Sequence, residues 1–332
     1  MQKMKIGVVL SGGGAKGAYE VGFLKALSEY NLQPHAIAGT SIGALNGAIF
    51  SAQKDVNKTV EVLESLWEEL ANDNVLKVDN MKAVKNIVDV FLTFAPMPVS
   101  RITKIVTVML RTGSAQEGVL TQLPISNRLA TYAPIDSLKK GLPFYVGMTK
   151  SRGNIEDTLA FAGMTNEETV FKKIQSFDDD TMHKAIMASA SLPILFDGIE
   201  IEGEVYRDGC LSSVENEWGN TPAKPLVTDE RCTHLIVCHL NEGSFFNRFD
   251  PLFKDISIIE VRPKSGTFSS ELDPLMFNVE KINLWINQGY RDAKRILGDA
   301  FMAIDTVAVR KKVERVANDS VERLKSREFK LN

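Results

Sequence analysis

The chain has 332 residues, of which 44% are hydrophobic and 24% are charged, and its formal net charge is −3. This composition is typical of a globular protein with a sizeable core, and the slightly negative charge argues against nucleic acid as a partner. The three cysteines lack the paired spacing of a disulfide framework or a zinc site, which favours a reducing compartment. No stretch approaches the roughly 20 apolar residues that span a bilayer.

The first 53 residues alternate short apolar runs with helical patterns. Strands are expected at 5–10 and 35–39, and helices at 15–30 and 41–53. A glycine cluster separates the first strand from the first helix, and a tight turn separates the second pair. Strands that alternate with helices in this way are typical of a parallel sheet with crossover helices, so an α/β fold is predicted.

The rest of the chain is expected to continue one domain, 1–332, with a helical insertion at 54–130 and a C-terminal helical segment at 271–332. A strand at 168–175 is expected to pair with 158–164. The other expected elements are helices at 56–70 and 86–98, a strand at 142–153, a helix at 180–193, a hairpin at 199–210, a helix capped by Asn220 or Thr221, strands at 234–240 and 255–263, and helix from 271 onward.

Four glycines follow the first expected strand. Gly12, Gly13, Gly14 and Gly17 form a G-x-G-x-x-G pattern with Lys16 inside it. A dinucleotide site would need an acidic residue near 38–41, where the sequence is AGTS, and a phosphate loop would need a hydroxyl residue after Lys16. A nucleotide-binding module stays open as an alternative. The glycine N–H groups at a helix N-terminus also suit an oxyanion that forms only in a transition state, and a plain tight turn is the simpler interpretation.

The second expected strand ends in a G-x-S-x-G pattern, with Gly39 and Gly43 on either side of Ser41. A strand before this pattern and a helix after it are typical of a nucleophile elbow, although a serine can also be a simple helix cap. Of the four histidines, His239 is the one that could complete a catalytic triad with Ser41 and Asp208. The alternative function is therefore a serine esterase that hydrolyses small soluble esters with the triad Ser41–Asp208–His239. Because His239 directly follows a strand, a structural histidine is the competing interpretation.

A third motif, Asp208-Gly209, follows the expected hairpin strand. The glycine-rich loop, G-x-S-x-G and Asp-Gly, in this order, resemble the patatin-like phospholipases. The resemblance covers roughly 1–240 outside 54–130, and includes the segments 188–196 and 220–226. Cys210 departs from it, because the family usually has Gly or Ala after Asp-Gly; a small buried side chain is favoured there over a reactive thiol.

The resemblance implies a three-layer α/β/α patatin-like fold with a mainly parallel sheet. It also implies a Ser41–Asp208 dyad, with Gly12, Gly13, Gly14, Lys16 and Gly17 as the oxyanion and substrate-binding loop, and Gly39 and Gly43 as the elbow glycines. In this family a carboxylate takes the serine proton directly, so Asp208 is expected to be desolvated and close to Ser41. Lys16 either orients the loop or meets a lipid phosphate.

The implied substrates are lipid acyl esters, namely phospholipids, lysophospholipids or galactolipids. A cytoplasmic location with peripheral membrane contact is expected. The apolar stretch 88–99 is either a lid that contacts membrane or a piece packed on the body of the protein. No metal or cofactor is expected, because acidic clusters such as 177–180 lack the glycine and spaced ligands of a calcium loop, and activity is predicted to be independent of calcium. The sequence does not indicate whether an activator is needed.

Overall fold

The computed structural model describes residues 4–72, 122–161, 168–193, 196–211, 219–270, 273–300 and 302. Their framework is an eight-stranded sheet with the order β5-β6-β3-β2-β1-β7-β8, in which β4 also pairs with β3. The strands are β1 (Ile6–Leu10), β2 (Ala36–Gly39), β3 (Phe144–Lys150), β4 (Thr169–Lys173), β5 (Ile199–Ile201), β6 (Glu204–Asp208), β7 (His234–Cys238) and β8 (Ser257–Val261).

The sheet is mixed but mostly parallel. The pairs β1–β2, β1–β7, β2–β3 and β7–β8 are parallel, whereas β3–β4, β3–β6 and β5–β6 are antiparallel. Every residue of β1 is buried, as expected for a central strand of a parallel sheet covered on both faces. The predicted α/β class with a mainly parallel sheet is therefore confirmed.

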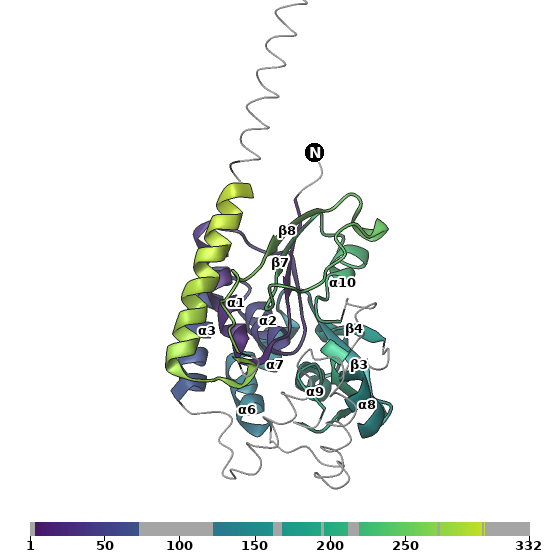
Figure 1. The fold of residues 1–332 in the computed structure, drawn as a ribbon. Coiled ribbons are helices and arrows are strands. Elements are labelled where there is room, and N and C mark those ends of the chain that lie inside the picture. Colours follow the sequence, from purple (N-terminus) through teal and green to yellow (C-terminus); the bar gives the residue numbers. More distant parts are fainter. Residues whose placement is uncertain are drawn as a thin grey trace, which may run out of the picture.

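Helices cover both faces of the sheet (Figure 1). The described helices with printed bounds are α1 (Ala18–Glu29), α2 (Ile42–Gln53), α3 (Val56–Asn72), α6 (Leu123–Tyr132), α7 (Ile135–Lys139), α8 (Asn154–Phe161), α9 (Asp179–Ala188) and α10 (Lys224–Thr228). A long helix occupies 279–300 and lies beside α1. Short 3-10 turns include η1 (Gly14–Gly17), η3 (Gly209–Leu211) and η6 (Asp273–Leu275).

Two apolar clusters hold these layers together. The larger lies between the sheet and α1, α2, α3, α9 and the long helix, and contains the fully buried Trp67, Phe23 and Trp285. The smaller lies on the other face, under α10, and contains Val9 and Leu226. Most of the hydrophobic stabilisation therefore comes from the face that carries α1 and α2, the two helices that follow the glycine loop and Ser41.

The arrangement of strands around β3 fixes the position of the site. β4 pairs with β3 over Tyr145–Thr149, so it occupies one whole edge of β3. Because a strand has two edges, β2 and β6 both pair with the second edge of β3. On that edge Gly39 lies opposite Val146, and Asp208 lies opposite Met148. The carboxyl ends of β2 and β6 point toward each other, with one β3 residue, Gly147, between the two pairings.

Three local expectations are wrong. Residues 154–161 form α8 rather than a partner for 168–175, and β4 pairs with β3 instead. The helix after residue 220 begins at Lys224 with Ala223 as its cap, because the Asn220 side chain accepts a hydrogen bond from Gly12 instead. The segment from 271 is not helical throughout, because η6 precedes the long helix that begins at 279.

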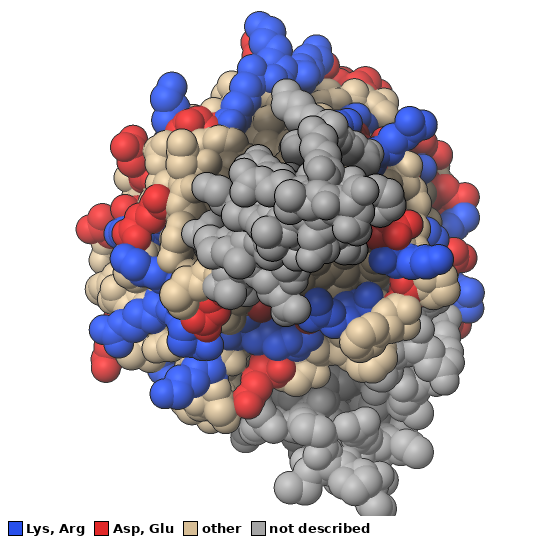
Figure 2. Space-filling view, turned by 90° about the horizontal axis from the view of Figure 1, so that it is seen from above, with Lys and Arg blue, Asp and Glu red and all other residues tan. Residues whose placement is uncertain are grey.

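The expected helix at 86–98, the possible lid at 88–99 and most of the expected insertion at 54–130 lie outside the described residues. Within the part that is described, α3 packs on α1 and α2. No helix among the described residues is both long enough and apolar enough to cross a bilayer. On the face shown in Figure 2, acidic and basic side chains are interspersed, in keeping with the small net charge.

Candidate active site

Ser41 lies in a sharp turn between β2 and α2. Its backbone has φ 56° and ψ −124°, a conformation that costs a non-glycine residue roughly 1–3 kcal/mol. A Cβ on Gly39 would lie 2.2 Å from the Gly43 carbonyl oxygen, and one on Gly43 would lie 2.4 Å from that of Leu10. The two predicted elbow glycines therefore allow the strand, the turn and the helix to approach closely, as a nucleophile elbow requires.

The strained turn is held by a second serine. The Ser41 N–H donates to the carbonyl oxygen of Ser189 at 3.0 Å and contacts the Ser189 hydroxyl at 3.1 Å. The Ser189 hydroxyl in turn donates to the Gly147 carbonyl at 2.7 Å. Ser189 thus ties the elbow to β3, and its position after α9 fixes the backbone of Ser41 relative to the sheet.

Asp208 is the last residue of β6 and is completely buried. Its Oδ1 accepts a hydrogen bond from the Cys210 N–H at 2.9 Å, whereas its Oδ2 has no hydrogen-bond partner. Burial raises the pKa of Asp208 to about 6, and the Cys210 N–H and the Ser41 side chain partly oppose this rise. A carboxylate with a free oxygen and a raised pKa is a competent proton acceptor near neutral pH.

Cys210 lies in η3, directly after the Asp-Gly turn. Burial raises the pKa of its thiol well above the ordinary value, and the neighbouring Asp208 carboxylate raises it further. A thiol with a raised pKa has little thiolate and reacts slowly. Cys210 is half-buried and lines the cavity described below, so the raised pKa rather than full burial disfavours a reactive thiol.

The glycine loop lies across from Ser41. Gly14 has φ 58°, and a Cβ there would lie 2.3 Å from the carbonyl oxygen of Pro274, so glycine is needed both for conformation and for space. The Gly12 N–H donates to Asn220 Oδ1 at 3.1 Å. Gly17 lies behind the loop, where a Cβ would lie 2.4 Å from Ile42, so its role is close packing of η1 on α2.

Lys16 is held in place rather than extended into solvent. It is 6% exposed, its Nζ donates to Asn241 Oδ1 at 2.5 Å, and the ammonium lies 5.0 Å from the centre of the Phe268 ring. Burial lowers the pKa of Lys16 to about 8, while the nearby Asp273 opposes that change. These contacts favour an orienting role for Lys16, one of the two roles that the sequence left open.

Most of these groups surround one cavity with a volume of about 400 Å³. Ser41, Gly12, Gly13, Gly14, Lys16 and Cys210 line it, so the glycine loop and the elbow face a common space, whereas the buried Asp208 is not among the lining residues. Gly17 and the elbow glycines support this wall from behind. Apolar side chains from α2, α6, η6 and the segment after α9 complete the lining, which is the arrangement expected for a substrate with a large apolar part.

The four histidines have partners that suit structural roles. His239 Nε2 lies 3.1 Å from Glu260 Oε2, its ring packs against Phe246, and it is absent from the cavity lining. His183 contacts the Ala133 carbonyl, His234 contacts Thr233, and His35 lies 3.7 Å from Glu230. Burial lowers the pKa of His239.

Sequence reasoning assigned no role in the site to several residues that the fold brings to it. Asn220 and Asn241 hold the glycine loop and Lys16, and Pro274, Leu275 and Phe277 line the cavity. They lie about 200 or more residues after the loop that they touch. Ser189 and Asn220 lie in segments that carried the family resemblance, whereas no local pattern marks Asn241, Pro274, Leu275 or Phe277.

Among the described residues, no group of three or more His, Cys, Asp and Glu side chains is arranged to hold a metal ion. The site contains a serine, a buried carboxylate and a set of backbone N–H groups. A strand–elbow–helix serine on a mostly parallel sheet is the arrangement typical of the α/β serine hydrolases.

Comparison with known proteins identifies the family. The model of the patatin-like phospholipases matches residues 8–216, more than half of the chain. The chain belongs to the patatin-like phospholipase family, a family of serine hydrolases. The predicted resemblance is confirmed.

Curated relatives match this chain over short segments. "Lysophospholipase nte1" of Aspergillus terreus is 51% identical over 51 residues, which are 15% of this chain and 3% of that protein. "Patatin-like phospholipase domain-containing protein 7" of Rattus norvegicus is 37% identical over 84 residues, which are 25% of this chain and 6% of that protein. The matched segments thus span a small fraction of these longer relatives.

Solved structures with a related arrangement include VipD from Legionella pneumophila, with a TM-score of 0.46 at 14% identity. That match covers 89% of this chain and 67% of VipD. The type III effector ExoU matches with a TM-score of 0.38 at 16% identity, over 89% of this chain and 53% of ExoU.

Proposed function

We propose that this protein is a lipid acyl hydrolase of the phospholipase A or lysophospholipase type, with Ser41 as nucleophile and Asp208 as base. The observation that carries the proposal is the Asp208 carboxylate, fully buried beside the strained Ser41, with Oδ2 unpartnered and a pKa raised to about 6. Membership of a phospholipase family and the apolar cavity support a lipid ester as substrate.

The first half of the reaction forms an acyl-enzyme. Asp208 takes the Ser41 proton as Oγ bonds to the ester carbonyl carbon, and the carbonyl oxygen becomes an oxyanion. The ester C–O bond then breaks, and the leaving alcohol takes the proton from Asp208. In the second half, Asp208 takes a proton from water, which attacks the acyl-serine, and the fatty acid leaves as Ser41 regains its proton.

The glycine loop is the proposed oxyanion hole. Asn220 already occupies the Gly12 N–H, so Gly13 and Gly14 are proposed as the donors that face the developing charge. Gly12 and Gly17 then act through the shape of the loop, and Lys16 acts by tying the loop to Asn241. Loss of one oxyanion donor costs about 10²–10³ in rate in enzymes of this kind.

The test is fatty-acid release from mixed phospholipid vesicles and lysophospholipid micelles with a metal chelator present. Ser41→Ala and Asp208→Asn are expected to lower the rate by about 10³-fold or more, because each removes a group on which both half-reactions depend. The controls are Ser51→Ala, which changes a buried serine, and Asp229→Asn, which changes an exposed aspartate; both residues lie outside the cavity. Equal rates in all variants would refute the dyad, and loss of activity in chelator would contradict calcium independence.

If the wild type releases no fatty acid, a fluorophosphonate probe tests the nucleophile directly. Labelling of the wild type but not of Ser41→Ala would support a competent nucleophile that awaits its own substrate or an activator.

The small-ester triad makes a different prediction. His239→Gln would abolish hydrolysis under that alternative, whereas full activity is expected here, because His239 pairs with Glu260 outside the cavity. Peripheral contact with membrane remains part of the proposal.

A further inference from the structure

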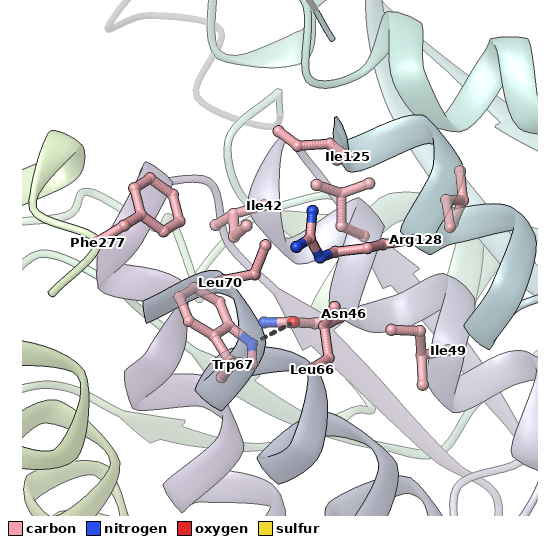
Figure 3. A pocket seen from close by; sticks show the side chains of 11 residues that line it. Ile42, Asn46, Ile49, Leu66, Trp67, Leu70, Ile125, Arg128 and Phe277 are labelled. Carbon is pink, nitrogen blue, oxygen red and sulfur yellow. Dashed lines mark hydrogen bonds between the residues drawn. The ribbon is translucent and has the colours of Figure 1, made fainter. Parts of the chain in front are cut away.

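A second, small apolar chamber adjoins the cavity (Figure 3). It lies between α2, α3 and α6, has a volume of about 30 Å³, and has eleven lining residues. Four of them, Ile42, Leu45, Ile125 and Phe277, also line the main cavity. The chamber therefore adjoins the space that contains Ser41, and these four side chains belong to the walls of both.

The polar groups of the chamber already have partners. The Asn46 amide donates to the Gly17 carbonyl and to Glu20, and its oxygen accepts from the Trp67 indole at 3.0 Å, as the dashed line in Figure 3 shows. The Arg128 guanidinium donates to the Pro124 carbonyl and lies 3.5 Å from Glu69. With its polar atoms engaged and its other walls aliphatic or aromatic, the chamber suits hydrocarbon rather than a headgroup.

The main cavity has both polar and apolar lining groups. The polar groups are the glycine loop, Lys16, Asn220 and Asn241, and the apolar residues that it shares with the chamber are Ile42, Leu45, Ile125 and Phe277. Ile42 directly follows Ser41 and lines both spaces. Apolar side chains therefore extend from Ser41 toward α3.

We propose that the acyl chain of the substrate runs from Ser41 past Ile42 and Leu45 into this chamber, whose α3 wall sets the preferred acyl-chain length. The inference rests on the proposed hydrolase function and adds the direction of the chain within the site. The chamber is small, so it accommodates the distal end of a chain whose remainder lies in the main cavity. Each methylene buried there contributes roughly fourfold to kcat/KM.

The first test measures kcat/KM for p-nitrophenyl esters with acyl chains from 4 to 16 carbons. Leu70 is the position to vary, because it lies on the α3 wall and is 6% exposed. Leu70→Phe narrows the chamber and is expected to lower activity on 12–16 carbons at least tenfold relative to 4–6 carbons. Leu70→Ala widens it and is expected to move the optimum to longer chains. Leu63→Ala, in the buried core of α3 but outside the chamber, is the matched control with an unchanged profile.

The outcomes separate the two proposals. An unchanged chain-length profile in both Leu70 variants, with hydrolysis still dependent on Ser41, would overturn the chamber assignment alone. Hydrolysis that does not depend on Ser41 would overturn the proposed function instead.

A second measurement does not need turnover. The probe is 12-bromododecanoate, whose terminal bromine quenches a nearby indole, added to Ser41→Ala protein. The Trp67 indole lines the chamber, so 12-bromododecanoate is expected to quench tryptophan fluorescence more strongly than the shorter 4-bromobutanoate does. The quenching by 12-bromododecanoate is expected to fall sharply in Trp67→Phe. Equal quenching with and without Trp67 would overturn the proposal, whether or not the wild type is active.

Discussion

At the scale of single residues, the site depends on holding two unfavourable states in place. Ser41 keeps a positive φ, and Asp208 is buried with one oxygen unpartnered. Both cost stability, and both are supported by neighbours: Ser189 holds the Ser41 backbone, and the Cys210 N–H holds Asp208 Oδ1. Such features concentrate where chemistry needs a preorganised nucleophile and base.

The pH dependence of activity follows from two of these residues. Asp208 must be ionised to accept the Ser41 proton, and its pKa is raised to about 6, so kcat/KM is expected to fall tenfold per pH unit below about 6. The Lys16 ammonium holds Asn241 by a charge-assisted hydrogen bond that weakens when the amine is neutral. Because its pKa is lowered to about 8, activity is expected to decline again above about 8. The check is a pH–rate profile with a neutral short-chain ester.

Lys16→Met separates the two limbs of that profile. The alkaline limb is expected to disappear in this variant while the acid limb stays near 6, because the variant leaves Asp208 in place. An alkaline limb that persists in Lys16→Met would assign it to another group, and an acid limb near 4 would show that Asp208 is not desolvated in solution.

At the scale of elements, the dyad is assembled by two strands that meet on one edge of β3. Gly147 lies between the two pairings, and a Cβ there would lie 2.7 Å from Thr40 Oγ1 and 3.1 Å from the Gly219 carbonyl. Gly147→Ala is expected to displace Thr40, whose hydroxyl donates to Gly219, and with it the neighbouring Ser41. Because misplacement by about 1 Å costs roughly 100-fold, a loss of this order in kcat is expected.

The matched control for Gly147 is Gly243→Ala, since a Cβ at Gly243 has no heavy atom within 4 Å. Steady-state kinetics on both variants, with thermal unfolding to confirm that they fold, decides the point. Activity of Gly147→Ala equal to that of Gly243→Ala would mean that the junction tolerates the shift and does not set the geometry of the dyad.

The sequence predicted those elements whose patterns are local. Strand β2, the elbow and α2 follow from apolar runs and glycine spacing within 20 residues, and Asp208 follows from the hairpin and the family resemblance. The pairing of β4 with β3 rather than with 158–164 could not be predicted in this way, because a short alternating run does not specify its partner. Asn220 was expected to cap a helix, since only the fold brings Gly12 within reach of its side chain.

At the scale of the whole molecule, residues after the family match complete the cavity. The match ends at 216, yet Asn241, Pro274 and Phe277 lie beyond it and line the space around Ser41. Phe277 also stacks on Trp67 of α3, with ring centres 6.0 Å apart. The segment from η6 into the long helix is therefore part of the site, and its position depends on how that helix is anchored to α1.

The anchor is a close crossing of α1 and the long helix at two glycines. A Cβ on Gly22 would lie 1.9 Å from the Ile286 carbonyl oxygen, and one on Gly289 would lie 2.0 Å from that of Tyr19. Beside the crossing, the Tyr19 hydroxyl donates to Asp292 at 3.0 Å, and the Lys264 N–H donates to the same carboxylate oxygen at 3.1 Å. The crossing thus fixes both the long helix and the chain that leads to η6.

Gly289→Ala tests this anchor. The added methyl meets backbone rather than a flexible side chain, so the helices must separate, and a loss of about 1–3 kcal/mol in the free energy of unfolding is expected. Activity is expected to fall as well, because η6 and Phe277 move with the helix.

Gly298→Ala is the control. A Cβ at Gly298 would meet only the tip of the Tyr30 side chain, at 3.1 Å. Because alanine favours a helix more than glycine does, the free energy of unfolding should be unchanged or up to about 1 kcal/mol higher. Denaturant unfolding of both variants gives the comparison, and equal stabilities would show that the crossing is looser than the structure indicates.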